Sequence, residues 1–177
     1  MALRLYHNLP APVQVYFLYS FLRKDDEIMA EGVRKRGKTW SYYFDTAKVG
    51  GERKKIENFI KQNKLEERIT LVGYLNQEQI REYIKKSKFI VLPSIWYENC
   101  PYSILEAMEI GKPIIGSRIG GIPELIEDEK NGFLYKYNSI DELAIKMRLL
   151  LENDKLAQSQ GKESRKLYEE KYSEEIY

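Results

Sequence analysis

Short apolar runs alternate with longer amphipathic segments from residue 13 onward. The apolar runs are rich in β-branched and aromatic residues, which predicts buried strands, and the longer segments repeat their apolar residues at helical spacing. Expected strands cover residues 13–20, 39–44, 69–73, 89–93, 113–116 and 132–135, and expected helices cover residues 25–36, 53–64, 77–87, 101–110, 140–152 and 156–171. The alternation predicts an α/β fold, a doubly wound, mostly parallel six-stranded sheet with helices on both faces.

Residues at the segment ends support these helices. Asn76 stands before the helix expected at 77–87, and Asn138 and Ser139 stand before the helix at 140–152. All three are favoured N-cap residue types. The last expected helix, 156–171, is highly charged and has few apolar residues, so we expect it to lie on the surface.

Length and composition indicate one globular domain. The chain has 177 residues, of which 43% are hydrophobic and 32% charged. We expect a tail at residues 1–12 and one domain at residues 13–177. The net charge of +2 favours no particular partner, and the basic clusters at 34–36 and 53–55 are short. They fit solvated helix faces, with phosphate or anionic lipid as the alternative contact, and nucleic-acid binding is not expected.

Cysteine and histidine content limits the possible chemistry. The single cysteine, Cys100, permits no internal disulfide, so a cytoplasmic location is the default. Cys100 has no histidine partner to activate it, since the only histidine, His7, lies in the expected tail. A histidine-centred metal site is therefore not expected, and no acidic pair resembles a metal-binding motif. We expect no transmembrane segment or signal peptide, so any membrane contact would be peripheral.

Two glutamates mark a candidate site. Glu98 and Glu106 lie where the strand at 89–93 gives way to the helix at 101–110. Two neighbouring carboxylates are costly to hold together unless something binds there. Pro101 suits the first helical position, and the free N–H groups of that helix end favour an anion such as a diphosphate. A carboxylate nearby would serve hydroxyls, and hydroxyls with a diphosphate describe a nucleotide-sugar.

The same residues also have structural explanations. Ser103 and Glu106 match the Ser-x-x-Glu capping box, which would make Glu106 structural. Glu98 could be an exposed loop carboxylate. Gly120 and Gly121 could form a simple turn, or they could permit a close backbone approach.

From residue 67 to about residue 147 the sequence resembles the C-terminal domain of the family 4 retaining glycosyltransferases. These enzymes have two Rossmann-like domains with a cleft between them, the B-type fold. The matching segments follow the family's order and are ERITLVGYL at 67–75, FIVLPS at 89–94, GKPIIGS at 111–117, GGIPE at 120–124 and NGFL at 131–134. Glu98 and Glu106 also fit the family's two glutamates separated by seven residues.

The resemblance implies the donor-binding domain of a retaining, metal-independent enzyme that moves a glycosyl group from a nucleotide-diphosphate sugar to an acceptor hydroxyl. Glu106 would accept hydrogen bonds from the donor's ribose hydroxyls. Glu98 would lie near the transferred sugar as the catalytic residue. The other donor-binding candidates in the junction and the glycine loop are Asn99, Pro101, Tyr102, Ser103, Gly120 and Gly121. No cofactor beyond the nucleotide-sugar substrate is implied.

The first fifty residues depart from the family pattern. The family places Gly-Arg and then Lys-Gly after its first strand, where the cations meet the diphosphate, but here no glycine follows that strand until Gly32. Arg23 and Lys24 are the cations near the corresponding place and are candidates for this role. The chain is also too short to include the family's acceptor-binding N-terminal domain. We therefore expect a domain or fragment that is inactive by itself and has that domain as its partner.

Two other function classes stay open. One is a non-catalytic nucleotide-sugar-binding or interaction module. The other is a different sugar enzyme of the same two-domain fold, such as a phosphorylase or an epimerase. The sequence does not specify the base, the sugar or the acceptor.

Overall fold

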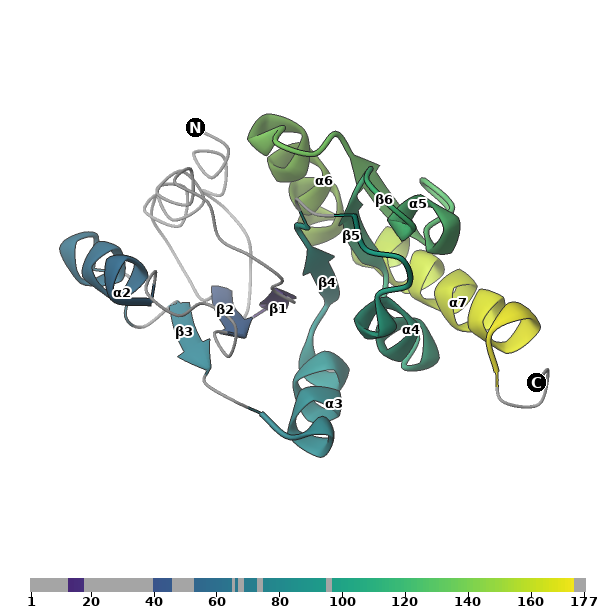
Figure 1. Ribbon diagram of the computed structural model, residues 1–177, viewed down its shortest axis with the longest axis horizontal. Coiled ribbons are helices and arrows are strands. Elements are labelled where there is room, and N and C mark those ends of the chain that lie inside the picture. The colour runs from purple at the N-terminus through teal and green to yellow at the C-terminus, as the bar shows by residue number, and fades with distance from the viewer. Residues whose placement is uncertain are drawn as a thin grey trace.

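The computed structural model describes residues 13–17, 40–45, 53–64, 66, 69–72, 75–94 and 97–173. Its centre is one sheet of six parallel strands in the order β3-β2-β1-β4-β5-β6 (Figure 1). The strands are β1 (Val13–Phe17), β2 (Trp40–Asp45), β3 (Ile69–Val72), β4 (Phe89–Leu92), β5 (Ile114–Ser117) and β6 (Gly132–Tyr135). The predicted six-stranded, doubly wound parallel sheet is confirmed.

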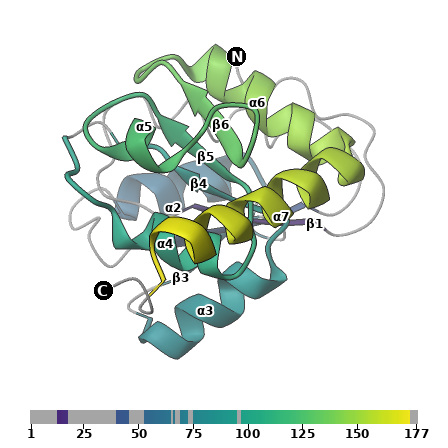
Figure 2. The ribbon, with the colours of Figure 1, turned by 90° about the vertical axis from the view of Figure 1, so that its right-hand side faces the viewer.

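Helices cover both faces of this sheet. They are α2 (Arg53–Gln62), α3 (Gln77–Lys86), α4 (Tyr102–Glu109), α5 (Ile122–Leu125), α6 (Ile140–Glu152) and α7 (Asp154–Lys171). One apolar cluster joins the sheet to α2 and α6, and the other joins it to α3, α4 and α5. Figure 2 shows α7 running from beside α6 toward α4, and its side chains contribute to both clusters.

The alternation of side chains along β4 explains why the sheet has two apolar faces. Phe89 and Val91 lie in the cluster with α2 and α6, whereas Ile90 and Leu92 lie in the cluster with α3 and α4. All four are almost completely buried. Successive side chains of a strand point to opposite faces, so a wholly apolar strand is the sequence expected in the middle of such a sheet.

Most predicted helices are present within a few residues of the expected limits, and α6 matches them fully. The helix expected at 25–36 lies outside the described residues. The sequence did not predict the short helix α5. The expectation for the last helix was incomplete, because α7 begins at Asp154 and buries a face on which four of the five residues are small or polar. That face comprises Ala157, Gln160, Gly161, Ser164 and Leu167.

The strand order places a ligand-binding position beside β4. The chain adds β2 and β3 on one side of β1 and then crosses to the other side to form β4. In doubly wound sheets ligands bind outside the carboxyl ends of the strands at the point where the order reverses. The loop that follows β4 contains Glu98, so the predicted site residues lie at this reversal.

Candidate functional site

Glu98 is tied to the carboxyl ends of two strands. The hydroxyl of Ser94, just after β4, donates to Oε1 of Glu98 at 3.3 Å, and the hydroxyl of Ser117, the last residue of β5, donates to the Ser94 carbonyl at 2.5 Å. Ser94 and Ser117 are almost fully buried, and Glu98 is half-buried. Glu98 is therefore not a freely exposed loop carboxylate. The sequence analysis gave these serines no role, although each directly follows or ends an apolar strand.

The glycine loop after β5 packs against the backbone of the Glu98 loop. The N–H of Gly121 donates to the Glu98 carbonyl at 2.6 Å. A Cβ on Gly121 would lie 1.9 Å from the carbonyl oxygen of Asn99, and a Cβ on Gly120 would lie 2.6 Å from that of Glu98. Gly120 also has a φ of +57°, which favours glycine. The two glycines thus permit a close backbone approach rather than only a turn.

The start of α4 differs in detail from the expected arrangement. Pro101 is the N-cap residue, with φ −72° and ψ 101°, rather than the first helical residue. Ser103 is then already inside the helix, so the capping box that Ser103 and Glu106 could have formed is not present. Among the described residues no side chain caps α4, and the first-turn N–H groups of Tyr102 and Ser103 are left to an external partner.

Glu106 lies in the second turn of α4 and is half-buried. No described residue makes a hydrogen bond or ion pair with its carboxylate. With the capping role excluded, Glu106 has an ionisable group beside an open helix N-terminus and no internal structural task. It is therefore available for a ligand.

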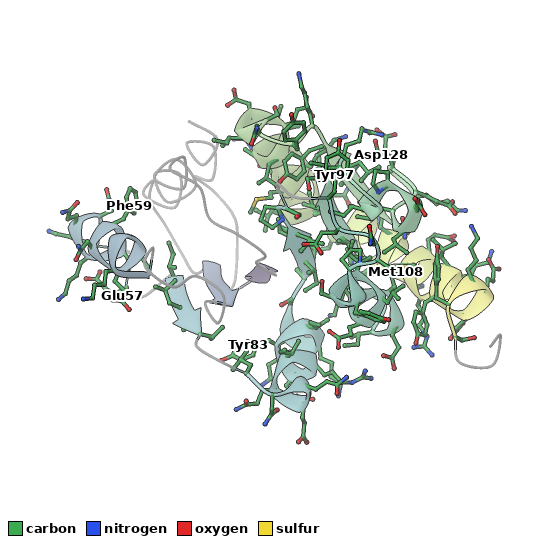
Figure 3. The ribbon with its side chains drawn as sticks, viewed as in Figure 1. Glu57, Phe59, Tyr83, Tyr97, Met108 and Asp128 are labelled. Atoms are coloured by element: carbon green, nitrogen blue, oxygen red, sulfur yellow. The ribbon has the colours of Figure 1, made fainter. Side chains whose placement is uncertain are left out.

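Two tyrosines flank this region. Tyr97 is 84% exposed and Tyr102 is 78% exposed, and Asn99 and Cys100 are exposed as well. Figure 3 shows Tyr97 on the same side of the molecule as Asp128, away from Tyr83 of α3. Exposed aromatic side chains that lie close together can form part of an interaction surface, whereas single ones are common. The loop around Glu98 therefore presents a polar and aromatic surface.

The two cations proposed for the diphosphate lie outside the described residues. Arg23 and Lys24 are not described. Within the described part of the chain, no group of three or more His, Cys, Asp or Glu residues could hold a metal ion. No helix in that part is long and apolar enough to cross a membrane.

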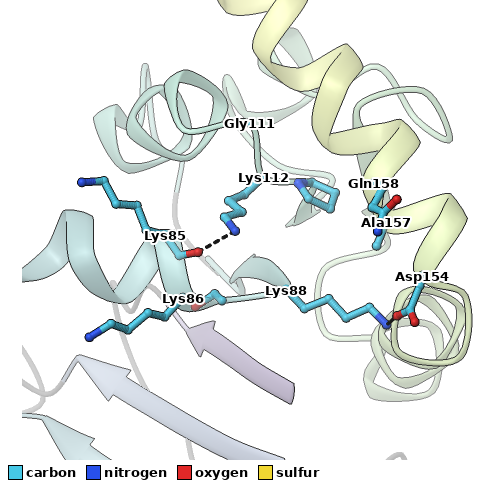
Figure 4. A pocket seen from close by; sticks show the side chains of 10 residues that line it. Lys85, Lys86, Lys88, Gly111, Lys112, Asp154, Ala157 and Gln158 are labelled. Carbon is cyan, nitrogen blue, oxygen red and sulfur yellow. Dashed lines mark hydrogen bonds and ion pairs between the residues drawn. The ribbon is translucent and has the colours of Figure 1, made fainter. Parts of the chain in front are cut away.

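A separate pocket of about 350 Å³ lies where the chain enters β4 and β5, at the opposite edge of the sheet from Glu98 (Figure 4). Four lysines line it, namely Lys85, Lys86, Lys88 and Lys112. The ammonium of Lys112 donates to the Lys85 carbonyl at the end of α3, at 2.7 Å, and burial lowers the pKa of Lys112. Lys88 donates to the Leu151 carbonyl in the last turn of α6, at 2.8 Å, and pairs with Asp154. These two lysines thus satisfy helix C-termini.

Comparison with known proteins identifies the family to which the chain is similar. The family described as Glycosyl transferases group 1 matches residues 48–167, more than half of the chain. An uncharacterized glycosyltransferase of Methanocaldococcus jannaschii is 34% identical over 120 residues, which is 68% of this chain and 33% of that protein. A poly(ribitol-phosphate) alpha-N-acetylglucosaminyltransferase of Staphylococcus aureus is 35% identical over 127 residues, 71% of this chain and 25% of that enzyme.

A solved structure is also similar to this chain over almost its whole length. A mutant of TarM from S. aureus, in complex with fondaparinux, alpha-GlcNAc-glycerol and UDP, superposes with a TM-score of 0.76 at 29% identity. The match covers 96% of this chain and 35% of TarM. The chain therefore spans about a quarter to a third of the length of these relatives.

Proposed function

Because the chain belongs to the group 1 glycosyltransferases, we propose that it forms the donor-binding domain of a retaining glycosyltransferase. The domain would hold a nucleotide-diphosphate sugar, and the full enzyme would transfer the glycosyl group to an acceptor hydroxyl. The acceptor would face this site from a second domain, as in enzymes three to four times as long.

The observation that carries this proposal is the junction between the loop of Glu98 and the start of α4. The hydrogen bond from Gly121 to Glu98 fixes the loop, and the uncapped start of α4 presents free N–H groups beside it. A helix N-terminus of this kind favours a diphosphate, because its N–H groups and the helix dipole both attract negative charge. The two carboxylates then suit the hydroxyl groups of the ribose and the sugar.

The residues of this site would act mainly on the leaving group. As the bond to the sugar breaks, negative charge develops on the departing diphosphate, and the N–H groups of Tyr102 and Ser103 would stabilise that charge. Glu98 would orient the transferred sugar, and Glu106 would hold the ribose. Asn99, Pro101 and the two glycines would shape the donor-facing wall. In the same proposal, the transfer needs no metal ion, and Arg23 and Lys24 are the candidate cations that contact the diphosphate.

The decisive experiment compares two glutamate variants. Glu106→Gln should weaken binding of UDP and of a UDP-sugar equally, by about 1–3 kcal/mol, because a charge-assisted hydrogen bond to the common ribose is lost. Glu98→Gln should weaken binding of the UDP-sugar while UDP affinity stays nearly unchanged. Isothermal titration of the purified chain measures both, and ADP and GDP with their sugars cover the other bases.

Glu78→Gln is the matched control, since it removes the same charge from an exposed position in the first turn of α3. Its affinities should equal those of the wild type. Unchanged affinities in all three variants, for every nucleotide that the wild type binds, would show that the donor site lies elsewhere.

A further inference from the structure

Glu106 shares one side of α4 with a second carboxylate. Glu109 lies three residues later, and side chains at this spacing are neighbours on a helix surface. Like charges at such positions repel each other. Glu109 does not face Glu106 unpaired, however, because Arg81 of α3 binds its carboxylate through both terminal nitrogens. Nη1 lies 2.6 Å from Oε2, and Nη2 lies 2.9 Å from Oε1.

This ion pair is partly shielded and geometrically fixed. The side chains of Arg81 and Glu109 are 35% and 29% exposed, and two parallel hydrogen bonds hold the planar guanidinium in one orientation. The guanidinium holds the pKa of Glu109 below its usual value. The pKa of Arg81 is raised, mainly by Glu109, and the charge of Glu106 contributes to that rise. Arg81 therefore lies within the electrostatic reach of both carboxylates but is bound to only one of them.

We propose that Arg81 and Glu109 are a positioning pair, which keeps the carboxylate of Glu106 unpaired so that it can accept the ribose hydroxyls of the donor. Neither residue touches the ligand in this arrangement. The inference rests on the proposed function, because it assigns a task to the surroundings of Glu106 in that site.

Arg81 and Glu109 each prevent the other from disturbing the carboxylate of Glu106. Without Arg81, the carboxylate of Glu109 loses its hydrogen-bonded partner, with only the charge of Arg165 nearby, and it repels the carboxylate of Glu106 along the helix. Without Glu109, the guanidinium of Arg81 can turn toward Glu106 and occupy the oxygens that the ribose needs. When both charges are removed together, neither disturbance remains.

The test is a double-mutant cycle measured with UDP and 2′-deoxy-UDP. The ratio of the two affinities reports the ribose contact, whereas a general loosening of α4 lowers both affinities together. Arg81→Gln and Glu109→Gln should each reduce the preference for UDP by about two- to fivefold, the size expected for an exposed or partly exposed ion pair. The double variant should regain the wild-type preference within error.

Arg165→Gln is the control for a purely structural effect. Arg165 of α7 donates to the backbone carbonyl of Glu109, so its loss loosens the same end of α4 while both hydrogen bonds between Arg81 and Glu109 remain. It should lower the melting temperature and leave the ratio of UDP to 2′-deoxy-UDP affinity unchanged.

Three outcomes would overturn the inference. Single variants that keep the wild-type preference would show that the pair has no effect on Glu106. A double variant that loses as much as the two single variants combined would show that Arg81 acts directly on the ligand or through helix stability. If the wild-type chain bound UDP and 2′-deoxy-UDP equally well, and Glu106→Gln left both affinities unchanged, the proposed function would be refuted as well.

Discussion

Replacement of Gly121 by alanine tests whether the two loops of the site are held together as closely as the structure indicates. The added Cβ would lie 1.9 Å from the Asn99 carbonyl oxygen and 2.9 Å from the carbonyl carbon. A carbon and an oxygen atom ordinarily approach to about 3.3 Å. The backbones would have to separate by about 1.4 Å, and the 2.6 Å hydrogen bond from Gly121 to Glu98 could not survive that shift.

The cost follows from these contacts. Overpacking of a closely packed site costs about 1–3 kcal/mol, and a lost hydrogen bond costs about 1 kcal/mol more. Alanine stabilises by restricting the unfolded chain, which returns about 0.4–1 kcal/mol. The free energy of unfolding should therefore fall by about 1–3.5 kcal/mol, which corresponds to a decrease of about 2–14 °C in Tm for a chain of this length.

Gly111→Ala separates this steric effect from backbone strain. Gly111 has a φ of +76°, but a Cβ there would meet its neighbours only at 3.4 and 3.5 Å. Gly121 has the opposite character, with an ordinary φ of −81° and a severe clash. Urea denaturation should give a loss of about 1 kcal/mol for Gly111→Ala. UDP binding should weaken only in Gly121→Ala. A smaller loss for Gly121→Ala than for Gly111→Ala would refute the reasoning.

Three further substitutions test other parts of the fold. Asn131→Ala should cost about 2 kcal/mol without changing ligand affinity, since this buried side chain hydrogen-bonds two backbone groups; urea denaturation and UDP titration measure the two effects. Asn76→Ala should cost about 1 kcal/mol in the same denaturation assay, because the capping box with Gln79 is lost. Glu109→Gln should change stability mainly above pH 4.5: Arg81 lowers the pKa of Glu109, so the stabilisation is complete above its ordinary pKa and disappears as the pH falls through the lowered value. Unfolding curves at several pH values check this, and an equal difference at pH 2 and pH 7 would contradict it.

The sequence predicted the sheet well because each strand carries its own signal. The β4 segment is apolar at every position, and a segment of four residues buried on both faces has few other interpretations. The Asn76 and Ser139 caps were likewise readable, since N-capping depends on residues only three positions apart. Residues close together in the sequence determine these strands and caps, so a short sequence pattern was sufficient to predict them.

The incorrect and incomplete predictions involve the geometry of helix ends and contacts between distant segments. Pro101 was predicted as the first helical residue, but it is the N-cap residue of α4, and a sequence motif does not specify where a helix starts. The packing of α7 was not apparent from the sequence, because it depends on a close backbone approach at small residues rather than on a stripe of apolar side chains. A Cβ on Gly161 would lie 2.4 Å from the Gly111 carbonyl oxygen, a contact across fifty residues of sequence.

The rigidity of the candidate site comes mainly from its backbone, and this explains why its side chains remain available. The Glu98 loop is held by the amide of Gly121 and by the close approach of Gly120, and the hydroxyl of Ser94 adds one hydrogen bond to the Glu98 carboxylate. Arg81 and Arg165 hold the C-terminal end of α4. The N–H groups at its start therefore keep a fixed orientation and are still free to donate to a ligand. Donors fixed in advance stabilise developing charge without reorganisation. Under the proposed function, substitutions at the exposed Tyr97 and Tyr102 would therefore alter ligand preference while the fold persists, whereas substitutions at the two glycines would disturb the backbone that forms the candidate site.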